Sequence, residues 1–232
     1  MQKKIAVIND LSGYGRCSLT VAIPVLSVMG HQCCPVPTAI LSNHTEFPVY
    51  FFDDYTEKMT AYTDKWKELG LSFDAVATGF LGSEAQIEIV MDMIRKLESE
   101  ETFVVVDPVM GDHGHAYETY TPEMCEQMKE LVCMADIVLP NVTECCILTD
   151  TPYKKENWTR RELLNMAMML RLMGAKSVVI TGVREGSYYT NVVLERGQME
   201  AKFIRTRSSG GERPGTGDVF SSVVAGALLN GK

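Results

Sequence analysis

The chain alternates short apolar runs with longer amphipathic stretches, a pattern that predicts strands and helices in turn. Apolar runs predict strands at about residues 4–9, 31–36, 74–78, 102–106, 136–139 and 177–180. Helical periodicity lies between them, at about residues 18–29, 55–69, 83–98, 121 onward and 159–173. Two more strands, 187–194 and 199–206, flank a turn that contains glycine and predict a hairpin.

Local signals mark the ends of several of these elements. Residues 11–18 contain two glycines and predict a turn after the first strand. Pro24 inside the first helix predicts a kink, and Gly30 its end. Ser83 predicts the N-cap of the third helix, which we expect to run to Glu98.

This order of elements predicts the fold class. Strands that alternate with helices favour an α/β fold with a doubly wound, mostly parallel sheet and helices on its flanks. The late hairpin predicts an antiparallel edge. At 232 residues and 46% hydrophobic content, the chain is expected to form one domain, residues 1–232.

The composition of the chain limits the classes of partner that we expect it to bind. A net charge of -8 and an isoelectric point near 5.1 argue against nucleic acid or an anionic membrane as the main partner. No apolar run is long enough to span a bilayer, and the first residues lack a signal-peptide layout, so we expect a cytoplasmic protein. The seven cysteines have neither disulfide-framework nor zinc spacing.

Polar side chains and glycines follow the predicted strands at their carboxyl ends, where ligands of open α/β sheets bind. A set of such loops at one sheet edge predicts a binding site, although each loop alone is also typical of ordinary turn and capping chemistry. The loops are residues 10–14, 43–45, 79–80, 107–112, 141–144, 181 and 215–218.

The last of these loops has the chemistry of an anion site. Gly215, Thr216 and Gly217 precede Asp218, and an apolar helix rich in small residues begins at once. The first amides of a helix lack intrahelical acceptors, and glycine lets a phosphate approach the backbone. The alternative is that Asp218 merely caps a helix after a glycine turn.

Two nucleotide-binding motifs are excluded. After the first strand, Gly13-x-Gly15 is followed by Ser18 where a dinucleotide fingerprint has its third glycine. Gly210 and Gly215 have P-loop spacing, but Thr216 stands where that motif requires lysine. His113 and His115 make a poor zinc site without a third ligand.

Four segments together resemble the pyridoxal/pyridoxamine kinase branch of the ribokinase-like kinases. They are residues 42–45 (Ser-Asn-His-Thr), 107–112 (Asp-Pro-Val-Met-Gly-Asp), 140–144 (Pro-Asn-Val-Thr-Glu) and 215–218 (Gly-Thr-Gly-Asp). They occur in the family's order along essentially the whole chain. The resemblance implies transfer of the ATP γ-phosphoryl group to a hydroxymethyl group on a pyridine ring, in a cytoplasmic homodimer.

The resemblance also assigns roles by position. Asp218 matches the catalytic base, and the amides of Gly215, Thr216 and Gly217 match the anion hole. The substrate-ring positions are Asp10, Ser12, His44, Thr45 and Phe80. The nucleotide positions are Asp107, Asn141, Glu144, Thr181 and Arg213. Asp107 and Glu144 are expected to hold Mg²⁺ through water, and the family resemblance adds a monovalent cation such as K⁺.

Two departures from the pyridoxal kinase pattern leave alternative functions open. Asp10 stands where many pyridoxal kinases have serine, and with Ser12 and Gly13 it is similar to the hydroxymethylpyrimidine kinases of thiamine synthesis. Phe80 replaces a frequent tyrosine. The chain also stops soon after its last helix, where family members continue, which predicts missing C-terminal helices. A hydroxymethylpyrimidine kinase and a non-catalytic ligand-binding homologue therefore remain alternatives to a pyridoxal kinase.

Overall fold

The computed structural model describes residues 2–97, 99, 101–211 and 213–232. They form two compact units, residues 1–105 with 212–232 and residues 106–211. In the part of the chain described, no helix is long and apolar enough to cross a membrane.

The first unit alternates strands and helices and recruits the last helix of the chain. Its strands are β1 (Lys4–Tyr14), β2 (Gln32–Asn43), β3 (Phe52–Asp54), β4 (Ala75–Thr78) and β5 (Phe103–Val106), whose last residue belongs to the second unit. Its helices are α1 (Leu19–Val28), α2 (Thr56–Glu68), α3 (Glu84–Leu97) and α7 (Thr216–Leu229). The strands follow the order β5-β4-β1-β2-β3, with β1 parallel to both β2 and β4.

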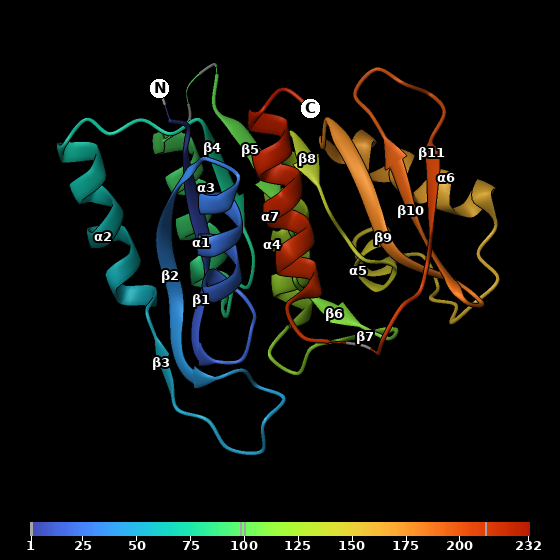
Figure 1. The fold of residues 1–232 in the computed structure, drawn as a ribbon, viewed down its shortest axis with the longest axis horizontal. Coiled ribbons are helices and arrows are strands. Elements are labelled where there is room, and N and C mark those ends of the chain that lie inside the picture. The colour runs from blue at the N-terminus through green and yellow to red at the C-terminus, as the bar shows by residue number, and fades with distance from the viewer. Residues whose placement is uncertain (1, 98, 100, 212) are drawn as a thin grey trace. The chain divides into compact units, whose positions relative to one another are not determined.

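The core of this unit follows from the alternation of side chains along β1. Ile5 and Val7 point to one face and pack with Leu19, Ala22 and Leu26 of α1. Helices α1 and α7 cover that face, whereas α2 and α3 cover the other (Figure 1). Helix α7 thus reaches β1 and β4 although it lies at the far end of the sequence from both strands.

The second unit ends in an antiparallel hairpin. Its strands are β6 (Gly111–Asp112), β7 (His115–Ala116), β8 (Ile137–Val138), β9 (Ser177–Glu185), β10 (Tyr188–Leu194) and β11 (Lys202–Arg207). Its helices are α4 (Pro122–Cys133), α5 (Val142–Leu148) and α6 (Arg160–Met173). Strand β8 is parallel to β9, and β9, β10 and β11 are antiparallel (Figure 1). The predicted α/β class, with its flanking helices and edge hairpin, is confirmed; the domain range 1–232 stays a prediction.

The structure corrects two strand ends. Residues 10–14 extend β1 rather than forming a turn, because β2 pairs with them as far as Tyr14 and Asn43, after a bulge between Asn9 and Leu11. Strand β2 likewise continues past Pro35 and Pro37. Strand β3 pairs only with residues 39–41, so these prolines lie where that edge has no β3 partner to bond.

Helix ends agree more closely with the sequence. Pro24 lies within α1, and the predicted kink stays a prediction. The Ser83 hydroxyl accepts the amide hydrogen of Gln86 at 3.3 Å, which confirms the predicted cap of α3. Glu98, the expected end of that helix, lies outside the described residues. Helix α5 was not predicted at all.

Candidate active site

The turn before α7 brings the 215–218 segment against the β1–α1 loop of the same unit. Gly215 caps the helix with a left-handed backbone, φ 78°. A Cβ added there would lie 1.9 Å from the carbonyl oxygen of Arg16. Both the backbone conformation and the close contact therefore require glycine. The helix starts at Thr216, so its first amides point out of the N-terminus with the positive end of the dipole.

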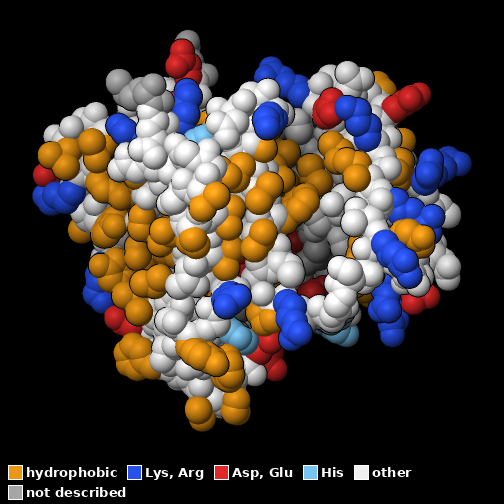
Figure 2. Space-filling model, viewed as in Figure 1, with side chains coloured by type: hydrophobic (Ala, Val, Ile, Leu, Met, Phe, Trp, Pro, Cys, Tyr) orange, Lys and Arg blue, Asp and Glu red, His pale blue; other side chains and the backbone are white. Residues whose placement is uncertain are grey.

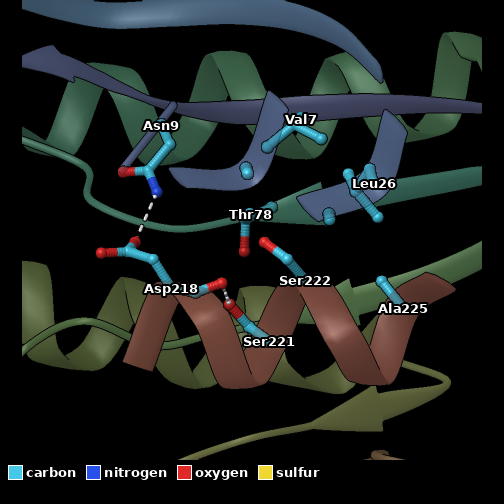
Figure 3. A pocket seen from close by; sticks show the side chains of 10 residues that line it. Val7, Asn9, Leu26, Thr78, Asp218, Ser221, Ser222 and Ala225 are labelled. Atoms are coloured by element: carbon cyan, nitrogen blue, oxygen red, sulfur yellow. Dashed lines mark hydrogen bonds between the residues drawn. The ribbon is translucent and has the colours of Figure 1, made fainter. Parts of the chain in front are cut away.

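Asp218 lies in the first turn of α7 and meets a side chain from the end of β1. The Asn9 Nδ2 donates to Asp218 Oδ1 at 3.1 Å. Figure 3 shows the two side chains pointing toward one another. Asn9 is 5% exposed, whereas Asp218 is partly open to solvent. A buried side chain thus holds the Asp218 carboxylate through a hydrogen bond, while part of the carboxylate stays accessible to solvent.

A small cavity of about 10 Å³ lies behind this pair. The residues that line it include Asn9, Thr78, Asp218, Ser221 and Ser222, and Figure 3 shows the hydroxyls of Thr78 and Ser222 pointing toward one another. This cavity has room for about one water molecule and is far smaller than a small-molecule pocket. The cavity is therefore too small for a heterocyclic substrate and belongs to the packing around Asp218.

Asp10 follows Asn9 and is also buried. Its Oδ2 accepts the hydroxyl of Ser12 at 2.8 Å. Burial raises the pKa of the Asp10 carboxyl, and the nearby charge of Asp218 raises it further, against the lowering effect of hydrogen bonds from Ser18 and Ser12. The predicted residues Asp10, Ser12 and Asp218 are thus brought together within one unit.

This raised pKa makes a stability prediction. Since the folded protein binds the Asp10 proton more tightly than the unfolded chain, the ionised carboxyl destabilises the fold at pH values above its folded pKa. Asp10→Asn removes that charge and should therefore raise Tm at neutral pH. The gain should shrink as pH falls toward about 4, the unfolded pKa. Thermal melts across this range test it; an unchanged or lower Tm at neutral pH contradicts it.

The other predicted substrate residues occupy different surroundings. The amide of Phe80 donates to Asn9 Oδ1 at 2.9 Å, which ties the loop after β4 to the end of β1. His44 lies against Gly15, where an added Cβ would come within 2.4 Å of its ring. Thr45 is exposed in the next turn, and no hydrogen bond among the described residues links it to Asp10 or Asp218.

The loop from β2 to β3 exposes large apolar side chains just beyond His44 and Thr45. Hydrophobic side chains gather there in Figure 2, at the lower tip of the view. They include Phe47, Val49, Tyr50, Phe51 and Phe52. The Phe47 ring packs on His44 at 4.6 Å and on Tyr14 at 5.6 Å between centroids. This aromatic loop therefore forms an apolar wall beside the predicted substrate residues.

In the second unit, Asn141 and Glu144 form a capping box at the start of α5. The Asn141 side chain accepts the Glu144 amide at 2.9 Å, and Glu144 Oε2 accepts the Asn141 amide at 2.7 Å. The Asn141 Nδ2 also donates to the Gly111 carbonyl at 2.8 Å. Thr181 forms an isolated parallel β-bridge with Asn141, and its amide donates to the Pro140 carbonyl at 2.9 Å. The fold thus brings three predicted nucleotide residues together.

Glu144 is a buried acid in a negatively charged setting. It is 4% exposed, and its Oε1 accepts the Met110 amide at 3.1 Å. Burial raises the pKa of Glu144 well above its usual range, and the charges of Asp107 and Asp112 add to this, against two backbone hydrogen bonds. Burial and the same Glu144 charge raise the pKa of Tyr120.

Two of these acids, Asp107 and Glu144, belong to the predicted magnesium site. No group of three or more His, Cys, Asp or Glu among the described residues is arranged to hold a metal ion directly. Asp107 is nevertheless close enough to Glu144 for its charge to raise the Glu144 pKa. A cation beside two such carboxyls stabilises their ionised forms. With each Glu144 oxygen already accepting an amide, the residues fit Mg²⁺ held through its water shell.

Two residues, Asn9 and Tyr120, were not predicted, and the role of a third, Arg213, stays a prediction. Asn9 was missed, although the alternation of Ile5, Val7 and Asn9 on β1 places it on the face covered by α7. Tyr120 was missed because nothing in its local sequence marks it as buried beside Glu144. Arg213 is exposed before α7, and its Thr216 neighbour donates to its carbonyl, so its nucleotide role stays a prediction.

Known proteins place this geometry in a family. The model of the phosphomethylpyrimidine kinase family matches residues 23–232. A Bacteroides thetaiotaomicron protein that carries that kinase name, crystallised with pyridoxal, is 42% identical, with a TM-score of 0.95 over 100% of this chain and 82% of its own. The pyridoxal kinase of Lactobacillus plantarum is 29% identical, with a TM-score of 0.91 over 100% and 82%.

Curated sequences agree with the structures. The pyridoxal kinase of Dictyostelium discoideum is 26% identical over 97% of this chain and 78% of its own length. The pyridoxine kinase of Bacillus subtilis is 27% identical over 100% and 78%. The predicted resemblance is confirmed: the chain belongs to the phosphomethylpyrimidine kinase family, in the pyridoxal kinase branch of the ribokinase-like kinases.

Proposed function

We propose that this protein transfers the γ-phosphoryl group of ATP to the hydroxymethyl group of pyridoxal, pyridoxamine or pyridoxine. The observation that carries the proposal is Asp218 in the first turn of α7, directly after the left-handed Gly215. That arrangement supplies a base and a set of backbone donors at one place. Curated relatives named as pyridoxal and pyridoxine kinases support the choice of substrate class.

Asp218 and the N-terminus of α7 would have separate roles in the reaction. Asp218 accepts the proton of the substrate hydroxyl while the hydroxyl oxygen attacks the γ-phosphorus, and the bond from that phosphorus to the β-phosphate breaks to release ADP. The amides of Gly215, Thr216 and Gly217 donate to the transferring phosphoryl group, whose negative charge the helix dipole also favours. Phosphoryl transfer depends mainly on positioning and charge stabilisation, which these groups provide without a P-loop lysine.

Other residues take supporting roles in the proposal. Asp10, Ser12, His44, Thr45 and Phe80 surround the heterocycle, with the aromatic loop as the apolar wall. Asp107, Asn141, Glu144, Thr181 and Arg213 contact the nucleotide. Asp107 and Glu144 would hold Mg²⁺ through water, and the ion would supply charge neutralisation at the phosphates. We also propose a homodimer, which the resemblance to pyridoxal kinases implies, and a cytoplasmic location.

A second candidate is phosphorylation of hydroxymethylpyrimidine. It is favoured by the buried Asp10 carboxyl, which stands where many pyridoxal kinases have serine, and by the name of the matching family. Both substrates are six-membered nitrogen heterocycles with a hydroxymethyl group, so one pocket could accept either.

Steady-state kinetics of the full-length protein separate the two candidates. With ATP and Mg²⁺ saturating, we expect a higher kcat/KM for pyridoxal than for hydroxymethylpyrimidine, both measured on one enzyme preparation. A higher kcat/KM for the pyrimidine contradicts the leading proposal. Tight pyridoxal binding without ATP consumption instead supports a non-catalytic homologue.

A further inference from the structure

We propose that Asn9 is a positioning residue for phosphoryl transfer, which fixes the carboxylate of Asp218 in the orientation needed to accept the substrate proton. The inference rests on the proposed function, because it assumes that Asp218 is the base. Asn9 lies at the end of β1 and is 5% exposed. Its Nδ2 donates to Asp218 Oδ1 at 3.1 Å (Figure 3).

The direction of this hydrogen bond is determined by the rest of the structure. Asn9 Oδ1 accepts two backbone amides, those of Asp10 and Phe80, each at 2.9 Å. Since an amide N–H can only donate, the oxygen of the Asn9 side chain must face them. Its NH₂ group then faces Asp218 and can only donate to it. Asn9 is thus held as a rigid donor rather than as a side chain that could turn over.

The space around Asn9 is also specific. An added Cβ at Gly79 would lie 2.3 Å from Asn9 Nδ2 and 2.8 Å from Oδ1. Glycine at this position, directly after β4, therefore leaves room for the Asn9 amide. Three segments far apart in the chain converge on one side chain: the end of β1, the loop after β4 and the first turn of α7.

The consequence for Asp218 concerns its two oxygens. Oδ1 receives the Asn9 amide, and no other side chain among the described residues donates to the carboxylate. The bond holds Oδ1 toward the protein, so Oδ2 is left to meet a substrate hydroxyl. A catalytic group held in this way keeps the geometry that proton transfer requires.

The competing explanation is that Asn9 only ties β1 to the loop after β4. Asn9→Asp separates the two roles because the shapes are nearly the same. One oxygen of the introduced carboxylate can still accept both backbone amides, which preserves the structural tie. At pH values where both carboxyls are ionised, the other oxygen replaces the donor and repels Asp218, which abolishes the positioning.

The decisive experiment measures kcat and KM of full-length wild type, Asn9→Asp and Asp218→Asn with ATP, Mg²⁺ and pyridoxal. We expect Asn9→Asp to lower kcat by about 10²-fold with a pyridoxal KM within roughly threefold of wild type. Asn165→Asp makes the same change at an exposed position of α6 and serves as the matched control, with wild-type kinetics. A wild-type kcat for Asn9→Asp overturns the inference.

Two further variants keep the result decisive. Gly79→Ala displaces the Asn9 amide without altering either side chain of the pair, and should lower kcat by about tenfold even if Asn9→Asp fails to fold. In an Asp218→Asn background, Asn9→Asp should cause no additional loss of kcat, because it acts through Asp218. Multiplicative losses, or a wild-type kcat for Gly79→Ala, overturn the inference. If wild type itself transfers no phosphoryl group, the proposed function fails instead.

Discussion

Asp218→Asn is expected to lower kcat for pyridoxal phosphorylation by about 10²–10⁴-fold while the KM for pyridoxal changes little. The substitution keeps the size of the side chain at the first turn of α7 but removes the carboxylate that we propose accepts the hydroxyl proton. Because Asp218 is partly exposed and meets Asn9 through one hydrogen bond, the fold should tolerate the change.

Steady-state kinetics of the full-length protein check this prediction, with a thermal melt to confirm folding. The matched control is Asp92→Asn on α3, an exposed carboxylate whose ion pair with Arg95 contributes little to stability. Its kcat should equal that of wild type. A folded Asp218→Asn enzyme with a kcat within roughly threefold of wild type would show that Asp218 has only a structural role in the first turn of α7.

Gly215→Ala should impair both stability and turnover. The left-handed backbone alone costs about 1–2 kcal/mol for alanine. The new Cβ would in addition lie 1.9 Å from the Arg16 carbonyl oxygen, so the turn must move away from the β1–α1 loop. Since that turn carries the amides of the proposed anion hole, we expect kcat to fall by about 10²–10³-fold.

Gly197→Ala is a close control for this variant. Gly197 has φ 77°, nearly the same as Gly215 at φ 78°, but nothing lies within 4 Å of its added Cβ. It should therefore show the backbone cost alone, with unchanged kcat. Chemical denaturation and kinetics of both variants test the difference. Equal stability losses and equal kcat values would mean that the contact with Arg16 has no functional consequence.

The alternation of elements was predictable because apolar periodicity is a local property. The extent of β1 was not, since the glycines at 13 and 15 favour a turn and only pairing with β2 extends the strand to Tyr14. Helix α5 was missed because seven residues are too few to show helical periodicity. The Asn141-x-x-Glu144 spacing is nevertheless a capping-box signal that could have revealed it.

Site residues were predictable where the chemistry lies within one loop. Glycines followed by Asp218 predict an anion site, and the carboxyl ends of strands predict the loops of the candidate site. The contact between Asn9 and Asp218 joins residues 209 positions apart, and no local pattern encodes it. The raised pKa of Glu144 likewise follows first from its burial and then from the charges of Asp107 and Asp112, which only the folded chain brings near.

The most direct test of the account is the fate of the ATP γ-phosphate. The full-length protein is incubated with γ-labelled ATP, Mg²⁺ and pyridoxal, and the products are separated and identified by mass spectrometry. The proposed function predicts one labelled phosphate on the hydroxymethyl oxygen of pyridoxal for each ADP formed, and a rate reduced by about 10²–10⁴-fold in Asp218→Asn. Label found only as inorganic phosphate, or no ADP formed while pyridoxal binds, would contradict it.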